Sequence, residues 1–432
     1  MPTARGWFTA ATGVTLWVVG RSFGTGVLEQ IGFGILALVA IAAVVVTLRR
    51  DDLRVERTIV PARARAGQAV AVELHLRNVA RRALPLLLLD DRLPLDLAGH
   101  ARFALSGVEA GGARTATYEV RPPRRGRFLI GPLGVSYLDP FGLAGTTTLL
   151  TDTDELLVHP RIERLTLPRD LGSQRSISMS ALRQLSGARG EDFYTMREYS
   201  QGDDLRRIHW PSTAKRGKPM IRQEETPWHT RATILLDDRA RPGEAFKESV
   251  AFERAVEAAA SFCDLYHRSG YTYRLVGAHH PGVASGRGTD HFQRCLDALA
   301  TLSPTDEARA GDALLARLAE LELGAGAEGT LVVVSTDLSP DAAGAVSRCL
   351  RRFGAAVALL YPLHRFGAGA GKSRWEGEAR VRDAVTALGR SGVPTLVLGA
   401  GQSLAAAWGA VASGSARAPQ GGEAWDRKHE PA

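Results

Sequence analysis

The feature that most constrains this chain is an uninterrupted apolar segment near its N-terminus. Residues Ile31 to Leu48 contain no charged side chain. An α-helix of this length rises about 27 Å, close to the thickness of a bilayer's hydrocarbon core. The segment therefore predicts a membrane-spanning helix, and it favours folds that carry such an anchor at one end.

A second uncharged segment, Trp7 to Gly20, precedes the first and is shorter. It can span a bilayer only if its helix continues past Arg21, whose long side chain could reach the interface. A short turn that contains glycine lies between the two segments. Residues 1–50 are therefore predicted to form a transmembrane helical hairpin, which contacts the lipid bilayer through residues 7–48.

Basic residues that flank the hairpin predict its orientation. Arg5 precedes the first helix, and Arg49, Arg50 and Arg54 follow the second. Segments on the cytoplasmic side of membrane helices are rich in Lys and Arg. The hairpin is therefore expected to lie in the cell (inner or cytoplasmic) membrane with both of its ends in the cytoplasm. The alternative is a cleaved signal peptide, but no clear small-x-small cleavage site follows the first apolar stretch.

Residues 51–164 change to a period of two. Val70, Val72, Leu74 and Leu76 alternate with other residues, and clusters of Gly, Pro and Asp separate such short segments. This pattern predicts an antiparallel β-sandwich. The stretch Gly126 to Leu143, which contains an Asp-Pro-Phe-Gly turn, is interpreted as part of the sandwich framework.

Residues 165–230 are predicted to hold a linker and the most distinctive motif of the chain. Gly202, Asp203 and Asp204 indicate a turn followed by a helix start, with Asp capping free backbone N–H groups. Trp210 and Tyr199 are expected to be buried between the flanking domains. The candidate interaction or structural residues are Arg197, Tyr199, Gly202, Asp203, Asp204, Arg206, His209, Trp210 and Lys215.

The same motif raises an enzymatic alternative. A hydrolase could use Asp203, Asp204 and His209, because paired carboxylates and a histidine serve acid–base chemistry. However, no nucleophile–base–orienter pattern accompanies them, and the neighbouring arginines would hold the aspartates ionised. A structural or docking role is therefore favoured, and no catalytic residue is assigned.

The motif resembles the hallmark of a bacterial membrane-protein family called domain of unknown function 58. That hallmark runs approximately R-x-Y-x-x-G-D-D-x-R-x-I-[HD]-W-x-x-[ST]-A-[RK]. The matching positions here are Arg197, Tyr199, Gly202, Asp203, Asp204, Arg206, Ile208, His209, Trp210, Ala214 and Lys215. The resemblance extends over nearly the whole chain, and it implies a MoxR-type AAA+ ATPase as partner but no known reaction.

Residues 231–415 alternate short apolar strands with amphipathic helices, which predicts a doubly wound α/β domain with a parallel sheet. The resemblance implies that this domain is of the von Willebrand factor A type. Such a domain normally binds a divalent metal through D-x-S-x-S after its first strand. Here Arg239 and Arg241 occupy both serine positions, so Asp237 and Asp337 form a degenerate site, and no metal or cofactor is expected.

Three further patterns bear on function. The three cysteines lie far apart in apolar helical contexts and indicate buried free thiols. Residues 367–373 (GAGAGKS) lack the first glycine of a phosphate-binding loop. The tail, residues 416–432, has the composition of a disordered segment.

The net charge of +8 comes from 54 basic and 46 acidic residues that are mixed along the chain. A basic nucleic-acid-binding protein is an alternative, but this mixing argues against a dedicated nucleic-acid face. The favoured hypothesis is a membrane-anchored interaction or assembly scaffold that works with a MoxR-type ATPase and is not an enzyme.

Overall fold

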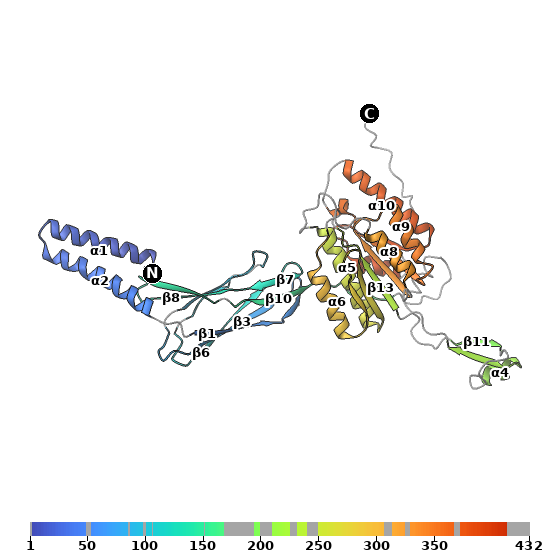
Figure 1. The fold of residues 1–432 in the computed structure, drawn as a ribbon, viewed down its shortest axis with the longest axis horizontal. Coiled ribbons are helices and arrows are strands. Elements are labelled where there is room, and N and C mark those ends of the chain that lie inside the picture. The colour runs from blue at the N-terminus through green and yellow to red at the C-terminus, as the bar shows by residue number, and fades with distance from the viewer. Residues whose placement is uncertain are drawn as a thin grey trace, which may run out of the picture. The chain divides into compact units, whose positions relative to one another are not determined.

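The chain divides into two compact units, Met1–His159 and Pro160–Ala432, which are described separately (Figure 1). The computed structural model describes residues 2–48, 53–84, 87–97, 101–105, 107–150, 152–167, 194–198, 210–224, 231–239, 249–305, 313–324, 329–366 and 372–412.

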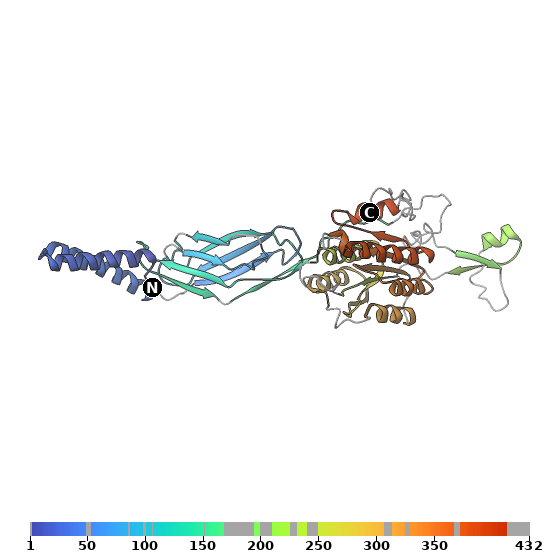
Figure 2. The same ribbon diagram turned by 90° about the horizontal axis from the view of Figure 1, so that it is seen from above.

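The first unit begins with two antiparallel helices, α1 (Ala4–Ser22) and α2 (Gly26–Leu48), which lie side by side in Figures 1 and 2. Glycines let their backbones approach closely. A Cβ added at Gly13 would lie 3.2 Å from the carbonyl oxygen of Gly32, and one at Gly32 would lie 2.6 Å from the amide of Trp17. Small residues at a helix contact are typical of membrane helices.

Only one of the two helices has the length and composition of a membrane span. Among the described residues, Gly26–Thr47 is the single helical segment long and apolar enough to cross a bilayer. Helix α1 ends at Ser22, one residue after Arg21. The apolar N-terminal helix is therefore present, whereas spanning by α1 stays a prediction.

The described residues of the first unit form ten strands after these helices, and inward and outward side chains alternate along the strands as the sequence predicts. They form three sheets with the orders β1-β3-β6, β2-β10-β7 and β5-β4-β8-β9. All pairs are antiparallel except β2 with β10. The strands are β1 (Leu53–Val60), β2 (Arg63–Arg65), β3 (Val70–Asn78), β4 (Leu87–Asp91), β5 (Arg102–Leu105), β6 (Ala113–Val120), β7 (Gly126–Ile130), β8 (Leu133–Leu138), β9 (Gly145–Leu150) and β10 (Asp154–His159).

The inward residues of these strands build one core. Val70, Val72, Leu74 and Leu76 are fully buried on one face of β3, which confirms the predicted period of two. They pack with Leu87 and other apolar residues from all three sheets. Burying these side chains supplies the main driving force for folding this region.

The second unit contains a six-stranded sheet with the order β15-β14-β13-β16-β17-β18. Every neighbouring pair is parallel except β14 with β15, which is antiparallel. The strands are β13 (Arg231–Leu236), β14 (Thr272–Gly277), β15 (Val283–Gly286), β16 (Thr330–Ser335), β17 (Ala355–Leu360) and β18 (Thr395–Val397).

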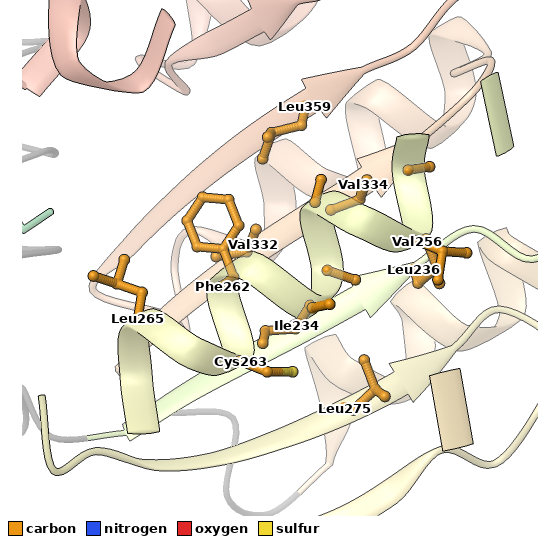
Figure 3. Packing of buried hydrophobic residues seen from close by; sticks show 14 of the residues in the cluster. Ile234, Leu236, Val256, Phe262, Cys263, Leu265, Leu275, Val332, Val334 and Leu359 are labelled. Atoms are coloured by element: carbon orange, nitrogen blue, oxygen red, sulfur yellow. The ribbon is translucent and has the colours of Figure 1, made fainter. Parts of the chain in front are cut away.

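Helices cover both faces of this sheet. Ile234 and Leu236 of β13 belong to one buried cluster and Leu235 to another, because successive strand residues point to opposite faces. Figure 3 shows Phe262 and Leu265 of one helix packed against the first of these faces. The helices are α5 (Val250–Arg268), α6 (Thr289–Thr301), α8 (Ala313–Leu323), α9 (Pro340–Cys349), α10 (Lys372–Arg390) and α11 (Leu404–Ala412), with a short 3-10 helix, η3 (Leu363–Phe366).

Local sequence explains where these helices begin. Ser249 accepts a hydrogen bond from the Phe252 amide at 3.2 Å, and Ser339 accepts one from the Ala342 amide at 3.2 Å. Both serines are N-caps, and Pro340 occupies the first turn of α9, where its missing N–H costs nothing. The predicted alternation of strands and helices is confirmed, although β15 and α11 are absent from the predicted elements.

The second unit also includes residues that the sequence assigned to the preceding domain and the linker. Leu165 is 1% exposed in the α/β core. The indole N–H of Trp408 donates to the carbonyl oxygen of Thr166 at 2.7 Å, and Glu163 accepts from the hydroxyl of Ser403 at 2.5 Å. Residues from Pro160 onward therefore pack on the α/β domain, and the boundary falls at His159 rather than at 164.

Candidate functional site

The order of the parallel strands locates the place where such sheets usually bind ligands. From the central strands, β13 continues to β14 and β16 continues to β17, which lie toward opposite edges of the sheet. Ligands of open α/β sheets bind beyond the carboxyl ends of the strands at this switch point. Asp237 and Asp238 follow β13 there, and Ser335 ends β16 with Asp337 two residues later.

The side chain of Arg239 binds the carboxylate of Asp237 at the end of β13. The Asp237 side chain is 1% exposed, and the guanidinium of Arg239 binds both its oxygens, with Nε at 2.7 Å from Oδ1 and Nη2 at 2.9 Å from Oδ2. The Ser335 hydroxyl lies 2.7 Å from Oδ2. Bidentate guanidinium–carboxylate pairs are among the strongest charge-assisted hydrogen bonds, so the carboxylate is fully engaged within the protein.

The neighbouring acids are also engaged by protein groups. Asp238 is fully buried and accepts hydrogen bonds from the amides of His279 and His280 at 2.7 and 2.9 Å. The His280 Nδ1 lies 2.7 Å from the same carboxylate. These contacts fix the loop after β14 to the end of β13.

Asp337 is the second predicted residue of the degenerate metal site. The Ser335 hydroxyl, which binds the Asp237 carboxylate, also bonds to the backbone of Asp337. The Asp337 amide donates to the Ser335 hydroxyl at 3.1 Å, and the Asp337 carboxylate accepts from Arg380 of α10 at 3.0 Å. The structure thus brings the two predicted acids together. Sequence reasoning missed the roles of Ser335 and Arg380, which no spacing rule marks.

At this edge of the sheet, the protein's own guanidinium occupies the Asp237 carboxylate. Hard divalent cations require several free oxygen ligands, whereas the Asp237 oxygens already bind a guanidinium that carries the compensating charge. Among the residues that the structure describes, no group of three or more His, Cys, Asp or Glu side chains could hold a metal ion. Arg241 lies outside those residues.

The signature motif is described only in part. Tyr199, Gly202, Asp203, Asp204, Arg206 and His209 lie outside the described residues. Arg197 belongs to β11 (Tyr194–Glu198), where it pairs in register with Ile221 of the antiparallel strand β12 (Met220–Glu224). Between these strands, α4 (Trp210–Arg216) contains Trp210 and Lys215.

The side chain of Trp210 corrects one expectation. Trp210 is 69% exposed, so it is not the buried anchor between two domains that the sequence analysis predicts. Helix α4 has no buried residue, and Lys215 and Arg216 are exposed. Met220 is 1% exposed, and its amide donates to the Thr213 hydroxyl at 3.0 Å, which connects α4 to β12.

The three cysteines do not form a reactive site. Cys263, Cys295 and Cys349 are free and buried, as predicted. Burial raises the pKa of the Cys349 thiol to about 11 and that of Cys263 well above its usual value. Because the thiolate is the nucleophile, the thiols of Cys263 and Cys349 stay protonated and unreactive at neutral pH.

The geometry defines a mixed α/β multidomain protein with an apolar N-terminal helix. The family described as "Protein of unknown function DUF58" matches residues 195–360, from β11 to the end of β17. This match supports the assignment of the chain to that family. No curated protein sequence matches the chain.

Solved structures match only limited parts of the chain. The CARDB domain of a Pyrococcus furiosus protein is 18% identical with a TM-score of 0.19, over 25% of this chain and 94% of that one. A DNA-bound alkylpurine DNA glycosylase of Pseudomonas fluorescens is 12% identical with a TM-score of 0.18, over 30% and 39%. Matches of this extent assign no activity to the chain.

Proposed function

We propose that this chain is a membrane-anchored interaction or assembly protein, which docks a partner protein through the element formed by β11, α4 and β12. One observation carries the proposal: Trp210 exposes 69% of its surface on a short helix. Trp is enriched at binding hot spots because it buries a large rigid surface and keeps a polar N–H. Exposing such a side chain costs stability that binding would recover.

Charge suggests the chemistry of the partner. Lys215 and Arg216 are exposed in the last turn of α4. A basic helix beside an exposed indole fits an acidic protein surface. The MoxR-type AAA+ ATPase implied by the family resemblance is our proposed partner.

The remaining domains support presentation of this element from a membrane. We infer that α2, packed against α1, anchors the chain in the cell membrane with the soluble domains facing the cytoplasm. We also infer a doubly wound domain of the von Willebrand factor A type, because the strand order has an antiparallel edge strand, β15, and parallel strands elsewhere. The guanidinium of Arg239 would stand in this domain where relatives bind a metal.

Docking through Trp210 is testable with a matched pair of variants. Trp210→Ala is expected to weaken binding of the purified ATPase by about 2 kcal/mol or more, roughly thirtyfold in Kd. Trp375→Ala is the control, because Trp375 on α10 is 67% exposed but lies outside the signature motif. Surface plasmon resonance measures both, and equal affinities for the two variants would refute docking through Trp210.

Anchoring by the N-terminal helices is a separate prediction. Removing residues 1–50 is expected to move the protein from the membrane fraction to the supernatant after carbonate washing. The reason is that, among the described residues, α2 alone is long and apolar enough to cross a bilayer. Immunoblotting of the two fractions measures the change. A truncated protein that stays in the carbonate-washed membranes would contradict the assigned anchor.

A further inference from the structure

The Asp-Pro-Phe-Gly turn between β8 and β9 is a rigid structure built around one carboxylate. Asp139 accepts hydrogen bonds from the amides of Phe141, Leu143 and Ala144 at 2.9–3.1 Å. The amide of Asp139 donates in turn to the carbonyl of Ala144 at 3.0 Å. These bonds hold the turn in one conformation, in which Phe141 is 66% exposed.

This turn contacts the end of the helical hairpin. The amide of Thr3 donates to the carbonyl of Leu143 at 2.9 Å, and its hydroxyl donates to the carbonyl of Gly142 at 2.6 Å. Leu143 and Ala144 pack in one cluster with Val46 of α2. The turn is therefore fixed where α1 begins and where α2 approaches its end, which is the level of a bilayer surface if α2 spans it.

Arginines lie at the same end of the β-rich domain. Leu53, the first residue of β1, pairs with Asn78, the last residue of β3. The Asn78 side chain donates to the carbonyl of Arg82 at 2.8 Å and so fixes the loop that follows β3. That loop leads through Leu84 to β4, whose first residue pairs with Tyr137 near the Asp139 turn.

Four exposed arginines form this basic cluster: Arg54, Arg77, Arg81 and Arg82. Arg54 and Arg77 are direct cross-strand partners, an arrangement of like charges that destabilises a sheet. Within the described part of the chain, no ion pair joins any of these four guanidiniums to a carboxylate. Two exposed acids lie nearby, Glu109 of the neighbouring loop and Glu56 on the same face of β1 as Arg54, so positive charge is still in excess.

An anion outside the chain would relieve this repulsion, and the position of the cluster indicates which one. The cluster lies at the end of the domain that also carries the exposed Phe141 and contacts the apolar helices. Phe is among the apolar side chains that bury at the boundary between lipid headgroups and acyl chains, and basic residues near a membrane bind the anionic lipids of its cytoplasmic face.

We propose that this end of the β-rich domain binds anionic phospholipid headgroups through Arg54, Arg77, Arg81 and Arg82, while Phe141 inserts at the lipid interface. This proposal rests on the membrane anchor proposed above and adds a second, lipid-specific contact. The β-rich domain would then contact the bilayer surface directly, in addition to its connection to the helical hairpin.

The test uses the full-length protein in vesicles and an environment-sensitive fluorophore on a single introduced cysteine. The three native thiols are buried, so Phe141→Cys is labelled at that position, and unsubstituted protein measures background labelling. Val60→Cys is the matched control, because Val60 is 51% exposed at the opposite end of β1. Seven residues of extended strand place it about 23 Å from Leu53.

In vesicles that contain phosphatidylglycerol, the label at 141 is expected to shift to shorter emission wavelengths and to be quenched by lipids that carry a shallow spin label. The label at 60 is expected to show neither effect. Replacing all four arginines with Gln is expected to abolish the difference between phosphatidylglycerol vesicles and pure phosphatidylcholine vesicles.

Two negative outcomes have different meanings. If the label at 141 is as water-exposed as the label at 60 while the protein resists carbonate extraction, the anchor stands and the lipid-binding surface is wrong. If the protein leaves the vesicles on carbonate washing, the anchor itself fails. A blue shift of equal size in both lipid mixtures would retain the insertion of Phe141 and overturn the role of the arginines.

Discussion

Arg239→Ala is expected to lower the free energy of unfolding of the α/β domain by about 3–5 kcal/mol. Asp237 is 1% exposed and depends on Arg239 for two short hydrogen bonds. Without the guanidinium, the carboxylate loses its two short hydrogen bonds to Arg239 and the positive charge that compensates it. Loss of the compensating charge is strongly destabilising, because burial has removed the hydration of the carboxylate.

A neighbouring pair provides the control. Arg380 binds Asp337 at the same edge of the sheet, but its side chain is 58% exposed. Exposed ion pairs contribute about 1 kcal/mol or less, so Arg380→Ala should change stability little. Urea unfolding monitored by tryptophan fluorescence compares the variants, since Trp408 is buried in this core. Equal losses in both variants would contradict the special role of Arg239.

The same pair illustrates how far the sequence could predict the site. The resemblance to a von Willebrand A-type domain predicts a degenerate metal site at Asp237 and Asp337, which stays a prediction, and the structure places both residues at one edge of the sheet. The sequence could not show that Arg239 folds back onto Asp237, because two residues of this spacing can also point apart. Ser335 joins the two acids from β16, and that contact depends on strand order rather than on local sequence.

The fold was more predictable than the surface. Apolar runs such as Leu331–Val334 and Ala355–Leu360 are short, continuous and bounded by turns, which identifies strands buried on both faces. Helix α11 was not predicted; it is short, and its nine residues are nearly all apolar, so that no alternation of polar and apolar residues marks one face. The exposure of Trp210 could not be predicted either, since a tryptophan in an aromatic-rich motif is more often buried.

The Asp139 turn shows a different limit of sequence reasoning. The residues Asp-Pro-Phe-Gly predict a turn correctly, and the interpretation as sandwich framework accounts for Asp139. It does not account for Phe141, because only the contacts of Thr3 and Leu143 reveal that the turn lies against the N-terminal helices. Those partners are some 140 residues apart, a separation at which no local pattern is informative.

Asp91→Ala is expected to destabilise the β-rich domain by about 3–5 kcal/mol. Asp91 is fully buried at the end of β4, and Arg57 of β1, 5% exposed, binds both its oxygens at 2.7 and 3.0 Å. Arg57 also binds Asp154 of β10 at 2.7 Å, so this network joins all three sheets. Burial, together with the hydrogen bond to Asp91, raises the pKa of Tyr118, which therefore remains a donor.

The adjacent residue is a control that differs mainly in burial. Asp90 binds Arg102 at 2.9 Å, but both side chains are about half exposed or more, so Asp90→Ala should have little effect.

A double variant distinguishes two causes of instability: the loss of the attraction between Arg57 and Asp91, and the Arg57 charge that stays buried without Asp91. Arg57→Met combined with Asp91→Leu removes both charges and should recover part of the stability lost in Asp91→Ala, because no charge then remains buried alone.

Hydrogen exchange of the full-length protein in detergent measures these differences strand by strand. In Asp91→Ala, the amides of β3 and β6 should exchange more than about a hundredfold faster, since each 1.4 kcal/mol corresponds to a factor of ten. The amides of β13 and β16 should be unchanged, because they belong to the other compact unit. Exchange in β3 that matches the unsubstituted protein would show that the buried network does not hold the three sheets together.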